Sequence, residues 1–475
     1  MNLDRSVCTV GSTRPALRST LERIYTDADL LTPRNARPGR RAGLSMTTPP
    51  PLAVARARSP IARWADQHAI AVPDDLDRRG ADLAAFDATT RGAVIVGLGE
   101  AAHQLHEVSR LKLRYVQHLV RHSGFRAVAW EDDWSLGTLI NDYLLGRRDD
   151  IDTLVGHMSK EQRTGEVVDV FTWLRDYNRL HPRDPVRFAG VEYFATRPLA
   201  YDAVEAFVAE VAPDQLGDVS SRLAILRPRS DDINAHLTWY LEVTNKAPYV
   251  RAAAEVHQLV AALPTQSDRH DVTVHHARQI RSFYKAFSLP WPQIPDYRDA
   301  RAAENVQWWK TVTRSKLIYW AAGAHVADAR VQITEPGQPE TTFLAAGSRL
   351  KRWYRDGYVR VGFTFDHGRY EPAPGQLIEL PPPAPGWVEH PLTEVARKQF
   401  LLGLDSHAPR PVRDWLTSPL TTRGLPEYGH DSMMTGGTLQ DWYDVLIHCR
   451  TVTPAALLSS ETQQLAASGL RQGGS

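Results

Sequence analysis

A glutamate and a histidine follow a short apolar run near residue 100, and together they could perform acid–base chemistry. The run Val94–Leu98 leads through a glycine into Glu100, and His103 comes three residues later. A carboxylate that bonds one ring nitrogen of a histidine orients the ring, so that the other nitrogen can act as a general base. We therefore interpret Glu100 and His103 as candidate catalytic residues.

Three more apolar runs lead into an ionisable side chain. A single charged strand end is ordinary, because strands stop where polar residues begin. The carboxyl ends of parallel strands, however, meet at one edge of a sheet. Four such ends together favour an active site, in which burial and like charges would shift the pKa values. The three further pairs of run and side chain are Phe125–Trp130 with Glu131, Val186–Val191 with Glu192, and Lys316–Ala321 with His325.

The residues after His103 have the apolar periodicity of a helix over 104–122. We expect His103 at the start of this helix, where the helix dipole opposes protonation and keeps the imidazole neutral near pH 7. Without neighbouring carboxylates, a histidine there would more simply be a cap or a surface residue. Glu107, Lys112 and Arg114 on the same helix indicate either a solvated charged face or a cation for an oxyanion or a substrate carboxylate.

Strands and helices alternate along most of the chain, which predicts an α/β fold. We expect a mainly parallel central sheet flanked by helices. A stretch at about 198–288 has helical patterns without clear strands, and we interpret it as a helical insertion that covers the strand ends. A proline-rich stretch at 372–391 is expected to be loop. Further expected helices are 136–145, 166–180 and 298–313, and further expected strands are 358–365 and 443–447.

Composition indicates a soluble globular protein. The 475 residues include 56 Lys and Arg against 55 Asp and Glu, a net charge of +1 that favours neither nucleic acid nor an anionic membrane as a partner. Two cysteines, Cys8 and Cys449, are too few for a disulfide framework or a thiolate metal site. We expect a cytoplasmic protein without a metal or other cofactor. It also contains no P-loop, dinucleotide fingerprint or Gly-x-Ser-x-Gly elbow.

Residues 1–55 are rich in Arg, Ser, Pro and Thr without an apolar core, which predicts a disordered N-terminal tail. Met46 is an alternative to Met1 as the true start. The structured domain is expected to occupy 56–475.

The chemistry-bearing residues resemble the motifs of the erythromycin esterase family. Its opening motif is Gly-Glu-Ala-Thr-His-Gly, with a glutamate four and a basic residue nine positions after the histidine. Gly99, Glu100, Ala101, His103, Glu107 and Lys112 match it. Later motifs follow in the same order over roughly residues 60–460: Gly124-Phe125 with Glu131; Asn141, Tyr143 and Gly146; Glu166 with Trp173–Asn178; Phe188–Glu192; Arg298-Asp299, Ala303–Asn305 and Trp308; Trp320 with His325-Val326; Gly362–Phe365; Tyr443-Asp444; and Thr453–Ala455.

The resemblance implies hydrolysis of a macrolide lactone ester without a covalent nucleophile or a required metal. His103 would activate water as general base. Glu100, Glu131 and Lys112 would orient and support it, and His325 would lie across the cleft. The partner would be a small molecule, a macrolide or another polyketide. Substrate-binding residues are expected among the other matched positions, namely Lys112, Glu107, Glu166, Glu192, Arg298, Asn141, Tyr143 and Asn305.

This chain departs from the family pattern at four positions. Ala102 replaces a threonine, Gln104 a glycine, Ala322 a histidine of the active site and Gly323 an asparagine. Loss of the histidine removes a proton donor or water-positioning group, a contribution worth typically ~100- to 10,000-fold in rate. Three functions therefore stay open: an esterase-like hydrolase, a biosynthetic tailoring enzyme that uses the same base for cyclisation, isomerisation or elimination, and a non-catalytic binding protein.

Overall fold

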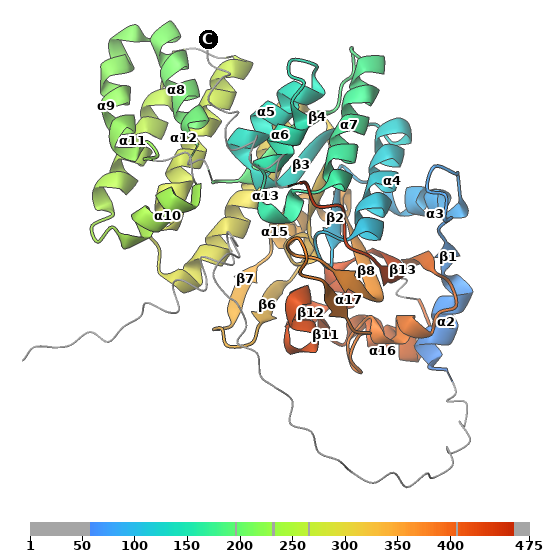
Figure 1. The fold of residues 1–475 in the computed structure, drawn as a ribbon. Coiled ribbons are helices and arrows are strands. Elements are labelled where there is room, and N and C mark those ends of the chain that lie inside the picture. Colours follow the sequence, from blue (N-terminus) through green and yellow to red (C-terminus); the bar gives the residue numbers. More distant parts are fainter. Residues whose placement is uncertain (1–57, 195–196, 230–232, 265–266, 405–406, 460–475) are drawn as a thin grey trace, which may run out of the picture.

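The computed structural model describes residues 58–194, 197–229, 233–264, 267–404 and 407–459 (Figure 1). The tail expected at 1–55 lies outside the described residues. Within them, no helix has both the length and the apolar character needed to span a membrane.

A twisted central sheet organises the chain, in the order β1-β10-β13-β8-β2-β5-β3-β4, with β9 paired to β8. All pairs from β13 to β4 are parallel. The strands β1 and β10 add antiparallel pairs at one margin, and β9 pairs antiparallel with the last residues of β8. The inner strands are apolar and buried on both faces, as parallel strands must be when helices cover them. The bounds are β1 Ile70–Ala71, β2 Ile95–Glu100, β3 Phe125–Asp133, β4 Arg187–Glu192, β5 Lys316–Ala322, β8 Tyr358–Tyr370, β9 Ile378–Leu380, β10 Gln399–Gly403 and β13 Val445–Val452.

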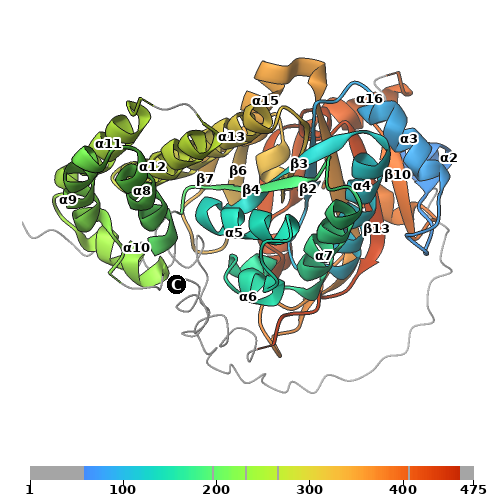
Figure 2. The same cartoon turned by 90° about the horizontal axis from the view of Figure 1, so that it is seen from above.

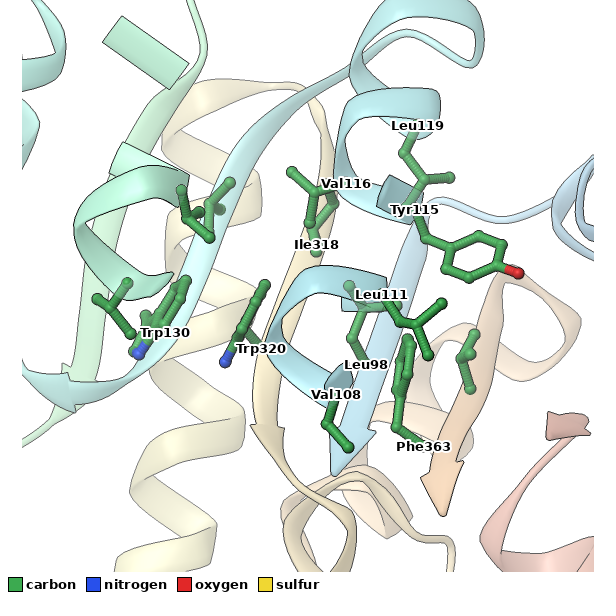
Figure 3. Packing of buried hydrophobic residues seen from close by; sticks show 14 of the residues in the cluster. Leu98, Val108, Leu111, Tyr115, Val116, Leu119, Trp130, Ile318, Trp320 and Phe363 are labelled. Carbon is green, nitrogen blue, oxygen red and sulfur yellow. The ribbon is translucent and has the colours of Figure 1, made fainter. Parts of the chain in front are cut away.

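Helices cover both faces of this sheet, which confirms the predicted α/β architecture (Figure 2). On one face, Leu111, Tyr115 and Leu119 of α4 pack onto Leu98, Ile318 and other alternate residues of the strands (Figure 3). The helices of this face are α3 Ala81–Thr90, α4 His106–His122, α5 Trp134–Leu144, α6 Ile151–Gly156 and α7 Gly165–Leu180. The opposite face packs against α13 Ile294–Thr313 and α15 Ala346–Tyr354.

The stretch after β4 is helical throughout its described residues and has a core of its own. Figures 1 and 2 show these helices as a bundle standing beside the sheet, beyond β4. Helix α12 joins the bundle to α5 and α13. Its helices are α8 Pro198–Val211, α9 Leu216–Leu226, α10 Ile233–Glu242, α11 Ala247–Ala261 and α12 Asp268–Ala286.

A second, antiparallel sheet, in the order β11-β12-β6-β7, is absent from the sequence-based expectations. Its strands are short and mostly polar, β12 contains two glycines, and only β6 alternates apolar with polar residues, over five positions. The stretch 372–391, expected to be loop, also contains β9. The bounds are β6 Arg330–Thr334, β7 Thr341–Leu344, β11 Pro419–Arg423 and β12 Met433–Thr438, and the remaining helices are α2 Pro60–His68, α14 Gly323–Val326, α16 Arg410–Thr417 and α17 Leu439–Trp442.

Candidate active site

The residues at the strand ends form two adjoining clusters at the carboxyl edge of the parallel strands. Glu100 ends β2, Glu131 lies within the last residues of β3, and Glu192 ends β4. His325 lies on α14, which begins directly after β5. The order β2-β5-β3-β4 makes these strands consecutive neighbours, so their ends come together without long connecting loops.

The first cluster centres on the buried carboxylate of Glu100. One of its oxygens lies 2.7 Å from Nδ1 of His103, and the other accepts a hydrogen bond from Lys112 Nζ at 2.8 Å. Lys112 is completely buried, with Nζ 3.9 Å from the centre of the Trp320 ring. The carboxylate thus compensates a buried ammonium and orients an imidazole at the same time.

This shared carboxylate sets the protonation of both partners. Burial lowers the pKa of His103, but the hydrogen bond to Glu100 and the charges of Glu100, Glu131 and Glu161 outweigh burial and raise it to about 9. Burial lowers the pKa of Lys112 to about 8, although Glu100 acts in the opposite direction. His103 is therefore mainly protonated at neutral pH.

The expectation of a neutral His103 at a helix start was wrong. Helix α4 begins at His106, and His103 lies in the preceding turn, where the helix dipole acts less strongly than the adjacent carboxylate. In that turn Gln104 has φ +56°, a left-handed conformation that favours glycine. This backbone conformation explains why the family pattern has glycine at the position of Gln104. Gln104 compensates through bonds of its buried amide to Tyr370 Oη and the Lys160 carbonyl.

The second cluster centres on Arg298 and His325. The Arg298 guanidinium donates to Glu131 and Glu192, at 2.9 Å and 3.0 Å. His325 lies between two carboxylates, with Nδ1 2.9 Å from Asp299 and Nε2 3.1 Å from Glu131. The partly buried cations and the buried carboxylates of this cluster thus compensate one another.

Charges within the second cluster shift its pKa values in opposite directions. Burial raises the pKa of Glu131, but His325 and Arg298 outweigh burial and hold it well below its usual range. Burial lowers the pKa of His325, but Asp299 and Glu131 raise it to about 10. Glu192 has a raised pKa because its burial outweighs the contact with Arg298. Glu131 also accepts the backbone N–H of Ala322 at 2.7 Å, which fixes the end of β5.

Two adjoining cavities, of about 450 Å³ and about 280 Å³, open onto these clusters. His103 and Ala322 line both cavities, so the candidate base lies where they meet. The first cavity extends towards β11, β12 and the segment after β8. The second contains Glu131, Arg298 and His325 and has aromatic walls from the end of β4, the end of the helical bundle and β7. The unforeseen small sheet thus forms one wall of the cleft.

Six of the eight expected substrate-binding residues line neither cavity, and one of them is Lys112, which bonds Glu100. Each of them makes contacts within the protein. Glu107 and Glu166 accept backbone N–H groups of Thr453 and Ala456, and Asn141 and Asn305 bond the backbone of Phe188 and Val191. Tyr143 is buried, with the Arg175 guanidinium 4.4 Å from its ring centre.

The structure also brings residues into the cleft that were not among the candidates. Asp299 bonds His325, and Tyr443 borders the first cavity beside Gly323. Both belong to matched family motifs, Arg298-Asp299 and Tyr443-Asp444, which was the signal available in the sequence. Among the described residues, no group of three or more His, Cys, Asp or Glu has an arrangement that could hold a metal ion.

The sequence model of the erythromycin esterase family matches residues 120–452, most of the described chain. The chain belongs to the erythromycin esterase family. Among curated proteins, this erythromycin esterase family member is similar to erythromycin esterase type II of Escherichia coli, with 21% identity over 296 residues, 57% of this chain and 68% of that protein.

Solved structures share the fold of this family member at low sequence identity. A Bacillus cereus protein has a TM-score of 0.72 and 22% identity, and the matched region covers 84% of this chain and 98% of the Bacillus chain. A succinoglycan biosynthesis protein has a TM-score of 0.73 and 21% identity with the same coverage. A mutant of the erythromycin esterase EreC in its open conformation has a TM-score of 0.62 and 15% identity. The matched region covers 82% of this chain and 99% of the EreC chain.

Proposed function

We propose that this chain is an esterase-like hydrolase that opens a lactone or ester of a macrolide or another natural product. Membership of the erythromycin esterase family supports hydrolysis. The observation that carries the proposal is the bond between His103 Nδ1 and Glu100, at 2.7 Å, at the junction of the two cavities. The combined cleft has the size expected for a drug-sized ligand.

In the proposed reaction, neutral His103 takes a proton from a water molecule through Nε2, since Nδ1 is bonded to Glu100. The water oxygen forms a bond to the acyl carbon while the carbonyl electron pair moves onto its oxygen. When the carbonyl re-forms, the bond to the alcohol oxygen breaks, and His103 returns the proton to that oxygen. Glu100 stabilises the imidazolium between these steps, and Lys112 keeps Glu100 ionised.

The second cluster would position the substrate. Arg298, Glu131 and His325 line the second cavity with fixed donors and acceptors, which suit the hydroxyl and carbonyl groups of a polyketide. Its aromatic walls would hold the apolar parts. Since these polar groups already hold one another in place, little reorganisation accompanies binding.

The test is incubation of the purified chain with erythromycin and a panel of other macrolides and lactones, followed by mass spectrometry. Hydrolysis adds the mass of one water to the substrate. His103→Ala should abolish this product while the circular dichroism spectrum stays unchanged. If the wild type adds water to no member of the panel, the proposed hydrolysis of such lactones is wrong.

A tailoring enzyme is the second candidate, because Ala322 stands at the junction of the cavities in place of a family histidine. Without that polar group, His103 could remove a proton from carbon and drive cyclisation, isomerisation or elimination. The same mass measurement separates the two functions. Isomerisation and cyclisation leave the mass unchanged, and elimination lowers it.

A further inference from the structure

The Tyr443 side chain is buried against the sheet with its hydroxyl at the floor of the first cavity. It is 5% exposed, and it lines this cavity together with Glu100, His103 and Gly323. No hydrogen bond within the described part of the chain involves its hydroxyl. The hydroxyl is also not among the fully buried unpartnered atoms of the described residues, so it is accessible from the cavity and available for a group that enters it.

Three glycines form the slot in which the Tyr443 ring lies. A Cβ atom at Gly362 would lie 2.6 Å from ring carbons of Tyr443, and one at Gly99 would lie 3.4 Å away. At Gly323, a Cβ would lie only 2.2 Å from the Tyr443 hydroxyl. Gly323, which stands where the family has asparagine, therefore does not leave room for substrate, because the tyrosine hydroxyl occupies that space.

We infer that Tyr443 is a further catalytic residue, whose hydroxyl donates a hydrogen bond to the substrate carbonyl oxygen and to the oxyanion formed from it. This inference rests on the proposed hydrolysis. In this chain Ala322 supplies no polar side chain beside His103, and Gly323 leaves space for the Tyr443 hydroxyl at the neighbouring position.

The chemistry of the tyrosine suits a donor that keeps its proton. Burial raises the pKa of Tyr443 well above its ordinary value, and the charge of Glu389 adds to this effect. The hydroxyl therefore remains protonated while His103 alone accepts and returns the proton of water. Tyr370, which borders the same cavity, cannot substitute for it, because its hydroxyl already donates to Gln104.

The test compares Tyr443→Phe with wild type in hydrolysis of p-nitrophenyl butyrate and in binding of p-nitrophenyl methylphosphonate, a stable tetrahedral anion. Removal of one oxyanion donor should lower kcat by ~100-fold with KM nearly constant. Affinity for the phosphonate should fall by a similar factor. The melting temperature should not fall, because the hydroxyl has no partner within the protein to lose.

Tyr240→Phe is the matched control, since Tyr240 is a buried tyrosine in the helical bundle whose hydroxyl donates to the Tyr284 carbonyl. It should lower the melting temperature and leave kcat and phosphonate affinity unchanged. If Tyr443→Phe keeps wild-type kcat and phosphonate affinity, the role of Tyr443 is refuted while hydrolysis stands. If the wild type does not hydrolyse the ester but binds the phosphonate more tightly than Tyr443→Phe does, the proposed hydrolysis is wrong and Tyr443 still acts as a hydrogen-bond donor. Absence of both activities in the wild type overturns both.

Discussion

Glu100 interacts with two cationic groups, and this sharing decides how His103 can work. Its carboxylate is the partner of both the His103 ring and the buried Lys112 ammonium. Because the pKa of His103 is raised, only a small fraction of the imidazole is neutral at pH 7, but that neutral form is a stronger base than an ordinary histidine. The rate of a reaction that needs this neutral form must increase with pH.

We expect kcat/KM for ester hydrolysis to rise by about tenfold per pH unit from pH 6 and to level off near pH 9, because the free enzyme must lose the His103 proton. Glu100→Gln removes the charge that holds this proton, and burial then lowers the pKa of His103. The profile should shift to lower pH by more than one unit, with a smaller maximum. Stopped-flow or plate-reader kinetics from pH 6 to 10 measure both effects.

Asp87→Asn is the control for this experiment. Asp87 forms a comparable pair with His118, with 2.7 Å between the carboxylate oxygen and Nε2, away from the cleft. Its loss should leave the profile unchanged. A flat profile of the wild type between pH 7 and 9 would exclude His103 as the group that must be deprotonated.

Sequence reasoning located the residues of this cluster better than it described their state. Glu100 and His103 could be paired because an apolar strand ends just before them. The charge on His103 could not be foreseen, because it depends on where α4 begins and on burial beside three carboxylates. The raised pKa arises from contacts that spacing along the chain does not encode.

The segment 453–458, here called the C-terminal strap, crosses the starts of α4 and α7 directly beside the catalytic turn. Its backbone bonds His106, Gln104 and Gly165, at 2.9, 2.9 and 2.7 Å. Glu107 accepts both the N–H and the hydroxyl of Thr453, at 2.7 and 2.8 Å. The strap thus satisfies helix-start groups that would otherwise lack partners and fixes the turn that carries His103.

Glu107→Ala should therefore act on catalysis without contact to substrate. We expect a loss of about 1–3 kcal/mol in the free energy of unfolding, because two donors of Thr453 lose a charged acceptor. We also expect a lower kcat with KM nearly unchanged. Hydrogen exchange at the His106 amide, which donates to the strap, should become faster. Urea titration, steady-state kinetics and exchange mass spectrometry measure these effects.

Thr451→Ala is the matched control, because Thr451 lies on β13 just before the strap, is exposed, and its hydroxyl makes only a 3.5 Å contact with His367. It should change neither stability nor kcat appreciably. If Glu107→Ala raised KM and left both stability and exchange unchanged, Glu107 would be a substrate-binding residue and not a support of the strap.

The elements with long apolar patterns could be predicted, and the others could not. Strands β2, β3, β4 and β5 follow from apolar runs that end at glycine or charged residues, and α7 from its periodicity. The sheet formed by β6, β7, β11 and β12 is partly exposed and largely polar, and its central pair, β12 with β6, joins residues as distant in the chain as Met433 and Thr334. One wall of the cleft was therefore missing from the sequence-based interpretation.

Histidines with shifted pKa values should make the whole molecule less stable at both acidic and alkaline pH. Burial lowers the pKa of His236 and His276 to about 4 and that of His448 to about 3, while carboxylates raise those of His103 and His325. The contribution of His236, His276 and His448 to the free energy of unfolding is complete above pH 6.5. It is lost as the pH falls through their folded-state pKa values of about 4, 4 and 3. The contribution of His103 and His325 is complete below pH 6.5 and is lost as the pH rises through their folded-state pKa values of about 9 and 10. The free energy of unfolding should therefore be greatest near pH 6.5.

His448→Leu tests the acidic side of this curve. His448 lies on β13, which pairs with β8 and β10, and its Nδ1 is 3.0 Å from the Thr364 hydroxyl while Nε2 is buried without a partner. An apolar side chain of similar size should cost little at pH 7. It should reduce the slope of the unfolding free energy between pH 6 and 4 by about 1.4 kcal/mol per pH unit, because one proton fewer is taken up on unfolding. His181→Gln, at an exposed position at the end of α7, controls for loss of a histidine as such. Urea titrations at half-unit steps of pH give the slopes, and an unchanged slope in His448→Leu would show that His448 is already protonated in the folded protein.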